Sequence, residues 1–258
     1  MKILSTLIIS ASFFIVTGCG GSSIIVNEKY KDQDYSNRSI LIMPFPEEVV
    51  TVHNKDDVYD DFEEDRREPE AVIKDFLFKS INENAGISLK GIKIYEKEVD
   101  SNLPIFRKDT LKYFSISKRI GEDSILYKFY VPIREVLNSS SEKPEIVLVI
   151  NKLTFGRNYQ QNAPMYVPGN TVTTPGGSFT TPGHFTGGGS SEFLGASVEF
   201  IIYDYNEGDV ITAGKADVQV NFMFAMTRST WSACFEDIAD GIFKDSPFKW
   251  TKYYFKKK

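Results

Sequence analysis

The sequence of 258 residues predicts an α/β protein in which two or three helices pack on a mixed sheet, with α+β as the alternative class. Continuous apolar runs at 39–45 and 146–150 are typical of strands that are buried on both faces. Apolar residues at helical spacing follow Pro69 and return at 229–243. Hydrophobic residues make up 41% and charged residues 25%, as in an ordinary globular chain, and we expect a single domain over 39–245.

The charge and the rare residue types exclude several classes of function. With 30 basic and 35 acidic side chains the formal net charge is -5, so no global positive field attracts nucleic acid. Two cysteines and two histidines leave little material for a metal site or for a nucleophile paired with histidine. We therefore expect no metal, no cofactor, no catalytic residue and no nucleic-acid partner.

Residues 1–18 have the proportions of a secretory signal peptide. Lys2 precedes an apolar stretch of about fifteen residues, whereas a spanning helix needs ~20. The stretch ends in Val16-Thr-Gly-Cys19, which resembles the lipobox of bacterial lipoproteins. That resemblance implies cleavage before Cys19, diacylglycerol on its thiol and a fatty acid such as palmitate on the new amino terminus. Gly20 at the next position implies the outer membrane. The alternative is an ordinary signal peptide, or an uncleaved anchor, with an incidental cysteine.

The first part of the mature chain is predicted to contain little regular structure. Gly, Ser, Asn, Lys and Asp dominate 19–38, which predicts a lipidated flexible leader. The run at 39–45 is predicted to be a central strand. The acidic segment 47–70 is predicted to be a solvated loop inserted in the domain, because the alternating ligands and central glycine of a calcium loop are missing.

Three elements are predicted in the next part of the chain. Pro69 suits a first helical turn, and apolar residues recur at helical spacing up to Gly86. Alternating apolar pairs predict a strand over 87–99 with a kink at its glycine. Asp109 is predicted to cap a second helix that continues to Ile120.

The C-terminal half is predicted to form strands at 124–131, 145–155, 193–205 and 210–224, a closing helix at 229–243 and a basic aromatic tail at 246–258. Asn206-Glu-Gly-Asp209 is predicted to join the last two strands as a hairpin. Alternation from Ala216 onward predicts one buried and one wet face. Cys234 falls on the apolar stripe of the closing helix, which favours a core thiol over a reactive one.

The segment 156–192 is rich in glycine, proline and threonine. This density of proline and glycine predicts neither a helix nor a strand ladder, and a structureless loop of such length is usually functional or disordered. Its aromatic residues and one methionine are candidate partner contacts, namely Tyr159, Met165, Tyr166, Phe179 and Phe185. They could contact lipid, glycan or protein, or pack the loop onto its own domain, and the sequence favours neither reading.

No motif of an enzyme is complete. Residues 208–215 look like a phosphate loop, but five residues separate the two glycines and the required Ser or Thr is missing. Ser178 and Ser190 lie near glycines without completing a nucleophile elbow. Both histidines lie on segments that are predicted to be loops, which do not supply the preorganisation that catalysis requires. We therefore expect a protein that is not an enzyme.

The order of the predicted elements resembles a known group of envelope lipoproteins. The group is the α/β domain shared by the curli-export lipoprotein CsgG, the amino-terminal domain of TolB and the penicillin-binding-protein activator LpoB. Its first strand typically ends in Pro-Phe, as at Pro44-Phe45, and its hairpin matches Asp204, Gly208 and the aliphatic pair at 210–211. The resemblance implies an accessory of envelope assembly or secretion that binds other proteins.

The expected function is that of a membrane-anchored lipoprotein that serves as a protein-binding accessory in the bacterial cell envelope, facing the periplasm from the outer membrane. Its expected partners are the membrane, through the lipid at Cys19, and envelope proteins, including further copies of itself. One alternative is a subunit of an oligomeric outer-membrane secretion pore. Another is a lipid- or glycan-binding lipoprotein that uses 156–192.

Overall fold

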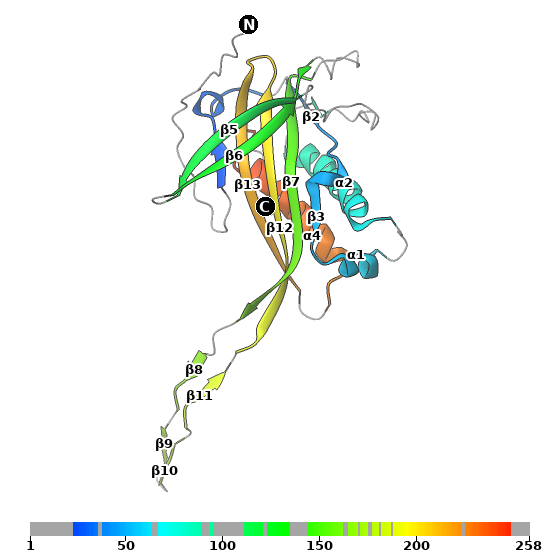
Figure 1. Cartoon of the computed structure of the whole chain (residues 1–258). Helices are drawn as coiled ribbons and strands as arrows, with labels where there is room; N and C mark the ends of the chain where they lie inside the picture. The colour runs from blue at the N-terminus through cyan, green and yellow to red at the C-terminus, as the bar shows by residue number, and fades with distance from the viewer. Residues whose placement is uncertain are drawn as a thin grey trace.

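The computed structural model describes residues 23–35, 38–62, 67–88, 93–94, 111–120, 123–134, 144–161, 165–169, 171–174, 177–180, 182–186, 188–222 and 225–248. The elements in chain order are β1 (Ser23–Val26), η1 (Glu28–Tyr30), β2 (Ser39–Ile42), η2 (Glu47–Val49), β3 (Val50–Val52), α1 (Lys55–Asp61), α2 (Pro69–Ser88), β4 (Lys93–Ile94), β5 (Leu111–Ile120), β6 (Asp123–Pro132), β7 (Ile146–Gln161), β8 (Met165–Val167), β9 (Thr171–Thr174), β10 (Gly177–Thr180), β11 (His184–Thr186), β12 (Ser190–Asp204), β13 (Asp209–Phe222) and α4 (Arg228–Lys244). A seven-stranded mixed sheet has the order β1-β13-β12-β7-β2-β4, and β3 also pairs with β7. Helices pack on one face of the sheet and the β5–β6 hairpin packs on the other (Figure 1). The predicted α/β class, with a mixed sheet and packing helices, is confirmed.

The three longest strands of this sheet, β7, β12 and β13, are antiparallel neighbours with β12 in the middle. The first five residues of β7, Ile146 to Ile150, are buried, as the continuous apolar run predicts for a strand covered on both faces. The predicted hairpin between the last two strands is confirmed, and Gly208 supplies its positive φ of 69°. β2 lies between β7 and β4, which confirms the predicted central strand, and it is parallel to both.

The helical layer is built around aromatic rings. Trp231 and Phe235 of α4 lie 5.7 and 5.9 Å, between ring centroids, from Phe155 of β7. Leu77 and Ile81 of α2 are fully buried in the same core. The predicted helices from Pro69 and at 229–243 are confirmed, and the β13 positions from Ala216 onward pack their apolar side against this layer. Cys234 is buried there, and burial raises the pKa of its thiol.

The opposite face of the sheet is covered by β5 and β6, which corrects the helix predicted from Asp109 to Ile120. Ile116, Tyr127 and Phe129 pack against strands β7 and β12. Phe114 and Ile116 alternate with Ser115 and Ser117 in the middle of β5, so this stretch turns one apolar face to the sheet, which a helical face would not. The strand predicted at 124–131 is confirmed as β6.

The flexible leader predicted at 19–38 is wrong for its described residues, because β1 pairs along the outer edge of β13. Ile24 and Ile25 are buried on opposite faces of the sheet. Gly214 makes this close pairing possible, because a Cβ at that position would lie 2.2 Å from the carbonyl oxygen of Ser23. A cluster of three apolar residues, Ile24 to Val26, is therefore enough to place this part of the leader on the edge of β13.

The acidic segment 47–70 is also more regular than predicted, and it holds η2, β3, α1 and the start of α2. Val50, Val52 and Val58 are buried beneath its charged residues, which keeps this segment on the body of the protein. The strand predicted at 87–99 is corrected at its start, where α2 continues to Ser88, and in its described remainder Lys93 and Ile94 form β4. Residues 249–258 of the predicted tail lie outside the described residues, as do the signal segment and Cys19.

A search of the described residues for helices that are both long and apolar enough to cross a membrane found none.

Candidate functional site: a projecting arm

The strands β7 and β12 continue as a pair well beyond the helices and carry a long ribbon away from the body (Figure 1). β8 pairs with β11 and, further out, β9 pairs with β10. We call residues 158–191 the arm. The prediction that 156–192 sustains no ladder is therefore wrong. The described prolines at 168 and 182 fall between strands, while threonine and aromatic residues, which favour strands, fill the strands themselves.

The arm is a ribbon of minimal width. Both β8–β11 and β9–β10 are two-stranded, so each of these strands has one neighbour within the described part of the chain. An isolated two-stranded ribbon is marginally stable in water, because few side chains can bury one another. Strand edges also present backbone donors and acceptors to whatever lies beside them. The arm therefore has the geometry of an element that gains stability by binding.

The arm carries no Asp, Glu, Lys or Arg. From Asn158 to Ser191 there are 191 − 158 + 1 = 34 residues without one of these charges, in a chain of which 25% is charged. This absence of charge is a signal present in the sequence. It is not visible in the glycine and proline content of the segment, on which the loop prediction rests. Buried charges cost far more free energy than buried amides or hydroxyls that find partners. An uncharged arm is therefore suited to a surface that excludes water.

Of the five candidate contacts, the structure describes the side chains of two. Tyr159 on β7 is 63% exposed and Tyr166 on β8 is 55% exposed. They lie on different ladders of the same arm, and neither ring is buried against the body, which favours the partner-contact reading for these two. In the β8–β11 register Phe185 is the direct partner of Tyr166, and in β10 Phe179 is opposite Val172. The side chains of Met165, Phe179 and Phe185 lie outside the described residues.

Arg157 fixes the base of the arm to the body. Its guanidinium ion-pairs with Glu192 of β12, lies 3.3 Å from a carboxylate oxygen of Asp57 on α1 and sits over the ring of Phe222 at 5.3 Å from the centroid. Its backbone N–H donates to the side-chain oxygen of Asn54 at 3.0 Å. The hydrogen bond to Glu192 raises the pKa of Arg157. Charged side chains therefore occur up to the start of the arm and not within it. The contacts of Arg157 attach the base of the arm to α1 and β13.

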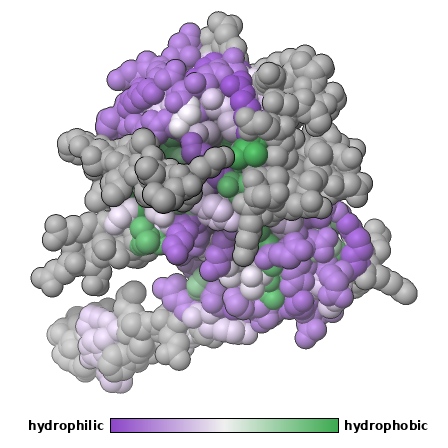
Figure 2. All heavy atoms as spheres, turned by 45° about the horizontal axis from the view of Figure 1, so that its top comes forward, coloured by the Kyte–Doolittle hydropathy of each residue, from purple (hydrophilic) through white to green (hydrophobic). Residues whose placement is uncertain are grey.

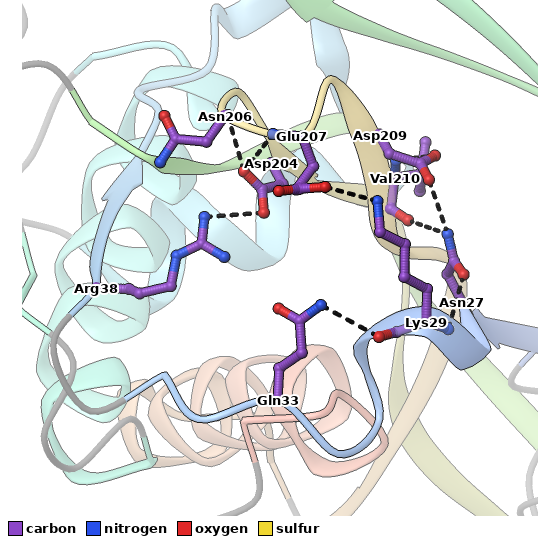
Figure 3. Close-up of polar contacts among 9 residues, drawn as sticks. All are labelled: Asn27, Lys29, Gln33, Arg38, Asp204, Asn206, Glu207, Asp209 and Val210. Carbon is purple, nitrogen blue, oxygen red and sulfur yellow. Dashed lines mark hydrogen bonds and ion pairs between the residues drawn. The ribbon is translucent and has the colours of Figure 1, made fainter.

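A second polar cluster lies at the opposite end of the sheet and is structural (Figure 3). Asp204 is fully buried and accepts the backbone N–H groups of Asn206 and Glu207 in the β12–β13 turn. Its other oxygen lies 2.8 Å from the guanidinium of Arg38, which also bonds Glu145 at 3.0 Å. These contacts join the chain before β2 to the turn.

The described charged groups of this cluster are paired with one another or with neighbouring polar groups. Lys29 of η1 lies 2.8 Å from Glu207, and Asn27 donates to Asp209 and to the carbonyl of Val210 (Figure 3). Such pairing leaves the described carboxylates of the cluster engaged in holding η1 and the turn together. Within the described residues, no group of three His, Cys, Asp or Glu side chains is placed to hold a metal ion.

Among the coloured residues in the view of Figure 2, the surface of the body shows no large hydrophobic area. Hydrophobic residues there form small separate areas between hydrophilic ones among the residues that are coloured. Small scattered apolar areas are normal on soluble domains and do not mark a binding site.

Comparisons with known proteins add little to this geometry. No protein-family model and no curated protein matches the sequence. Among solved structures, a crystal structure from Helicobacter pylori described as a neuraminyllactose-binding hemagglutinin homolog is similar at 7% identity, over 88% of this chain and 89% of that chain, with a TM-score of 0.34. A likeness at this TM-score carries no argument about the fold or the function of this chain.

Proposed function

We propose that the protein is a membrane-anchored lipoprotein that acts, without catalysis, as a protein-binding accessory in envelope assembly or secretion, and that the arm is its docking element. The observation that carries this proposal is the arm itself, a 34-residue uncharged ribbon that projects from a packed body. The lipid on Cys19 and its place in the outer membrane follow from the lipobox resemblance.

The chemistry of the arm favours a protein partner that offers a strand edge or an apolar groove. Addition of a strand to an exposed ribbon gives affinity through backbone hydrogen bonds, while pockets for alternate side chains give specificity. Exposed aromatic residues such as Tyr159 and Tyr166 are the residue types that dominate protein interfaces. No lysine or glutamate has to lose its water when the arm binds.

A photo-crosslinking amino acid at position 166, in living cells, tests the docking role. We expect adducts to an envelope protein from position 166 and none from position 79 on α2, where the exposed Lys79 serves as the matched control. Adducts from both positions, or from neither, would overturn the docking role. Adducts to lipid or glycan alone would assign the arm to the alternative function.

A shortened arm separates binding from folding. Tyr159 and Glu192 are directly opposite in the β7–β12 register, so an Asn-Gly turn can replace 160–191 and close the hairpin at that pair. We expect the variant to keep the unfolding midpoint of the body and to lose the crosslinked or co-purified partner. A variant that keeps the partner shows that binding resides elsewhere.

Mass spectrometry of the mature amino-terminal peptide tests the anchor. We expect Cys19 to be the first residue and to be acylated, and we expect Cys19→Ala and Cys19→Ser to leave unprocessed precursor, because only a thiol forms the thioether to diacylglycerol. An unmodified terminus at another residue contradicts the anchor, whatever the crosslinking shows.

A further inference from the structure

The β5–β6 hairpin carries apolar side chains on both of its faces. Its inner face packs on the sheet through residues such as Ile116 and Phe129. On its outer face Tyr113 is 60% exposed and Leu126 is 57% exposed. A ribbon that covers one face of a sheet normally turns polar residues to water, and here an exposed ring and an exposed aliphatic side chain share the outer face with polar ones.

The outer face also carries positive charge. In the β5–β6 register the exposed Lys128 is opposite Ser115, on the same face as Tyr113 and Leu126. Lys112 lies on the inner face, where it donates to the hydroxyl of Tyr203, so among the described side chains it is Lys128 that gives the outer face its positive charge. Aromatic, aliphatic and basic side chains on one face are the combination found where proteins meet anionic lipid headgroups.

The hairpin lies beside the point where the chain leaves toward Cys19. The hydroxyl of Ser23, the first residue of β1, is 2.7 Å from the hydroxyl of Tyr127 on β6. Cys19 is four positions before Ser23, and at ~3.6 Å per extended residue the two Cα atoms cannot be more than about 14 Å apart. A lipid on Cys19 therefore keeps the edge of the sheet, where β1 contacts this hairpin, close to the bilayer.

We propose that the outer face of the β5–β6 hairpin docks onto an anionic lipid surface. Tyr113 and Leu126 enter the headgroup layer, and Lys128 pairs with lipid phosphates. Helices α2 and α4 then face away from the bilayer. The inference rests on the lipid anchor of the proposed function for its geometry, whereas the chemistry of the face is independent of that anchor.

Lipid quenching tests the docked orientation in the full lipidated protein. Leu126→Cys, labelled with an environment-sensitive fluorophore, is compared with Lys79→Cys on α2, in vesicles whose phosphatidylcholine carries a quencher and which contain or lack phosphatidylglycerol. We expect quenching of the label at 126, stronger with phosphatidylglycerol, and none at 79. Equal quenching at both positions, or none at 126, overturns the inference.

Sedimentation with vesicles separates this inference from the anchor. The unlipidated chain that begins at Gly20 should bind phosphatidylglycerol vesicles and not pure phosphatidylcholine vesicles. Lys128→Gln should weaken that binding about fivefold, as expected for one basic residue near an anionic surface, while Lys79→Gln leaves it unchanged. Binding that ignores headgroup charge, or a dimer that Leu126→Ser dissolves, assigns the face to protein and overturns the inference. An unacylated Cys19 overturns the proposed anchor alone.

Discussion

Replacement of Arg38 by methionine should destabilise the fold strongly, because it leaves Asp204 as a buried carboxylate without its cation. The side chain of Asp204 is fully buried, and that of Arg38 is 17% exposed. Loss of one partner of a buried ion pair costs about 3–5 kcal/mol. Asp204 keeps two backbone N–H donors in the turn, so we expect the lower end, about 3 kcal/mol.

Urea unfolding measures this loss. With a slope of about 3 kcal/mol per molar for a protein of this size, the midpoint should fall by about 1 M. Addition of Asp204→Asn to Arg38→Met should recover most of the loss, since asparagine keeps the acceptor for the turn and removes the charge. Lys79→Met, at an exposed pair with Glu83, should change stability by less than about 0.5 kcal/mol. A loss below about 1 kcal/mol in Arg38→Met, or no recovery in the double variant, would refute the reasoning.

Three further perturbations follow from single contacts. Gly214→Ala should displace β1, because its Cβ would meet the carbonyl oxygen of Ser23 at 2.2 Å, and amide exchange at 23–26 should quicken while α4 stays protected. Arg157→Gln should free the root of the arm, so that amide exchange quickens on the arm side of β7 with little change in the urea midpoint; unchanged exchange there would contradict the lock at Arg157. Burial raises the pKa of Asp61 above its ordinary value of 3.8, against the hydrogen bond from the indole N–H of Trp231, which lowers it. A carboxyl group whose pKa is raised in the folded state contributes stability at low pH that is lost as the pH rises through the folded pKa. Asp61→Asn should therefore gain stability relative to the natural chain as the pH rises from below 3.8 to neutral. A gain that instead grows toward acid pH would contradict the raised pKa of Asp61.

The sheet and the main helices could be predicted because their signals are local. The run from Ile146 to Ile150, the turn at Gly208 and the apolar stripe of α4 each carry their own period or turn chemistry. The order of β1 could not be predicted, since it depends on an edge that forms almost two hundred residues later, where Gly214 leaves room for it. Local patterning does not report a partner strand that is distant in sequence.

Two further predictions were wrong because two local signals compete. Asp109 suggested a helix cap, yet the alternation around Ile116 describes the strand that the structure forms. In the arm, the number of prolines and glycines predicts no strand, whereas it is their position along the segment that decides the outcome. Residue type alone identifies Tyr159 and Tyr166 as candidate contacts. The lack of charged residues in the arm is visible only when Asp, Glu, Lys and Arg are counted over the whole segment.

The register at the root of the arm makes its length adjustable independently of the body. Beyond the pair of Tyr159 and Glu192, residues can be added or removed two at a time in each strand, and every remaining side chain keeps its face. A change by a single residue in each strand would turn all distal aromatic residues to the other face. Because closing a longer loop costs little additional entropy, the arm can act as a molecular ruler whose reach evolves in steps while the fold that carries it stays the same.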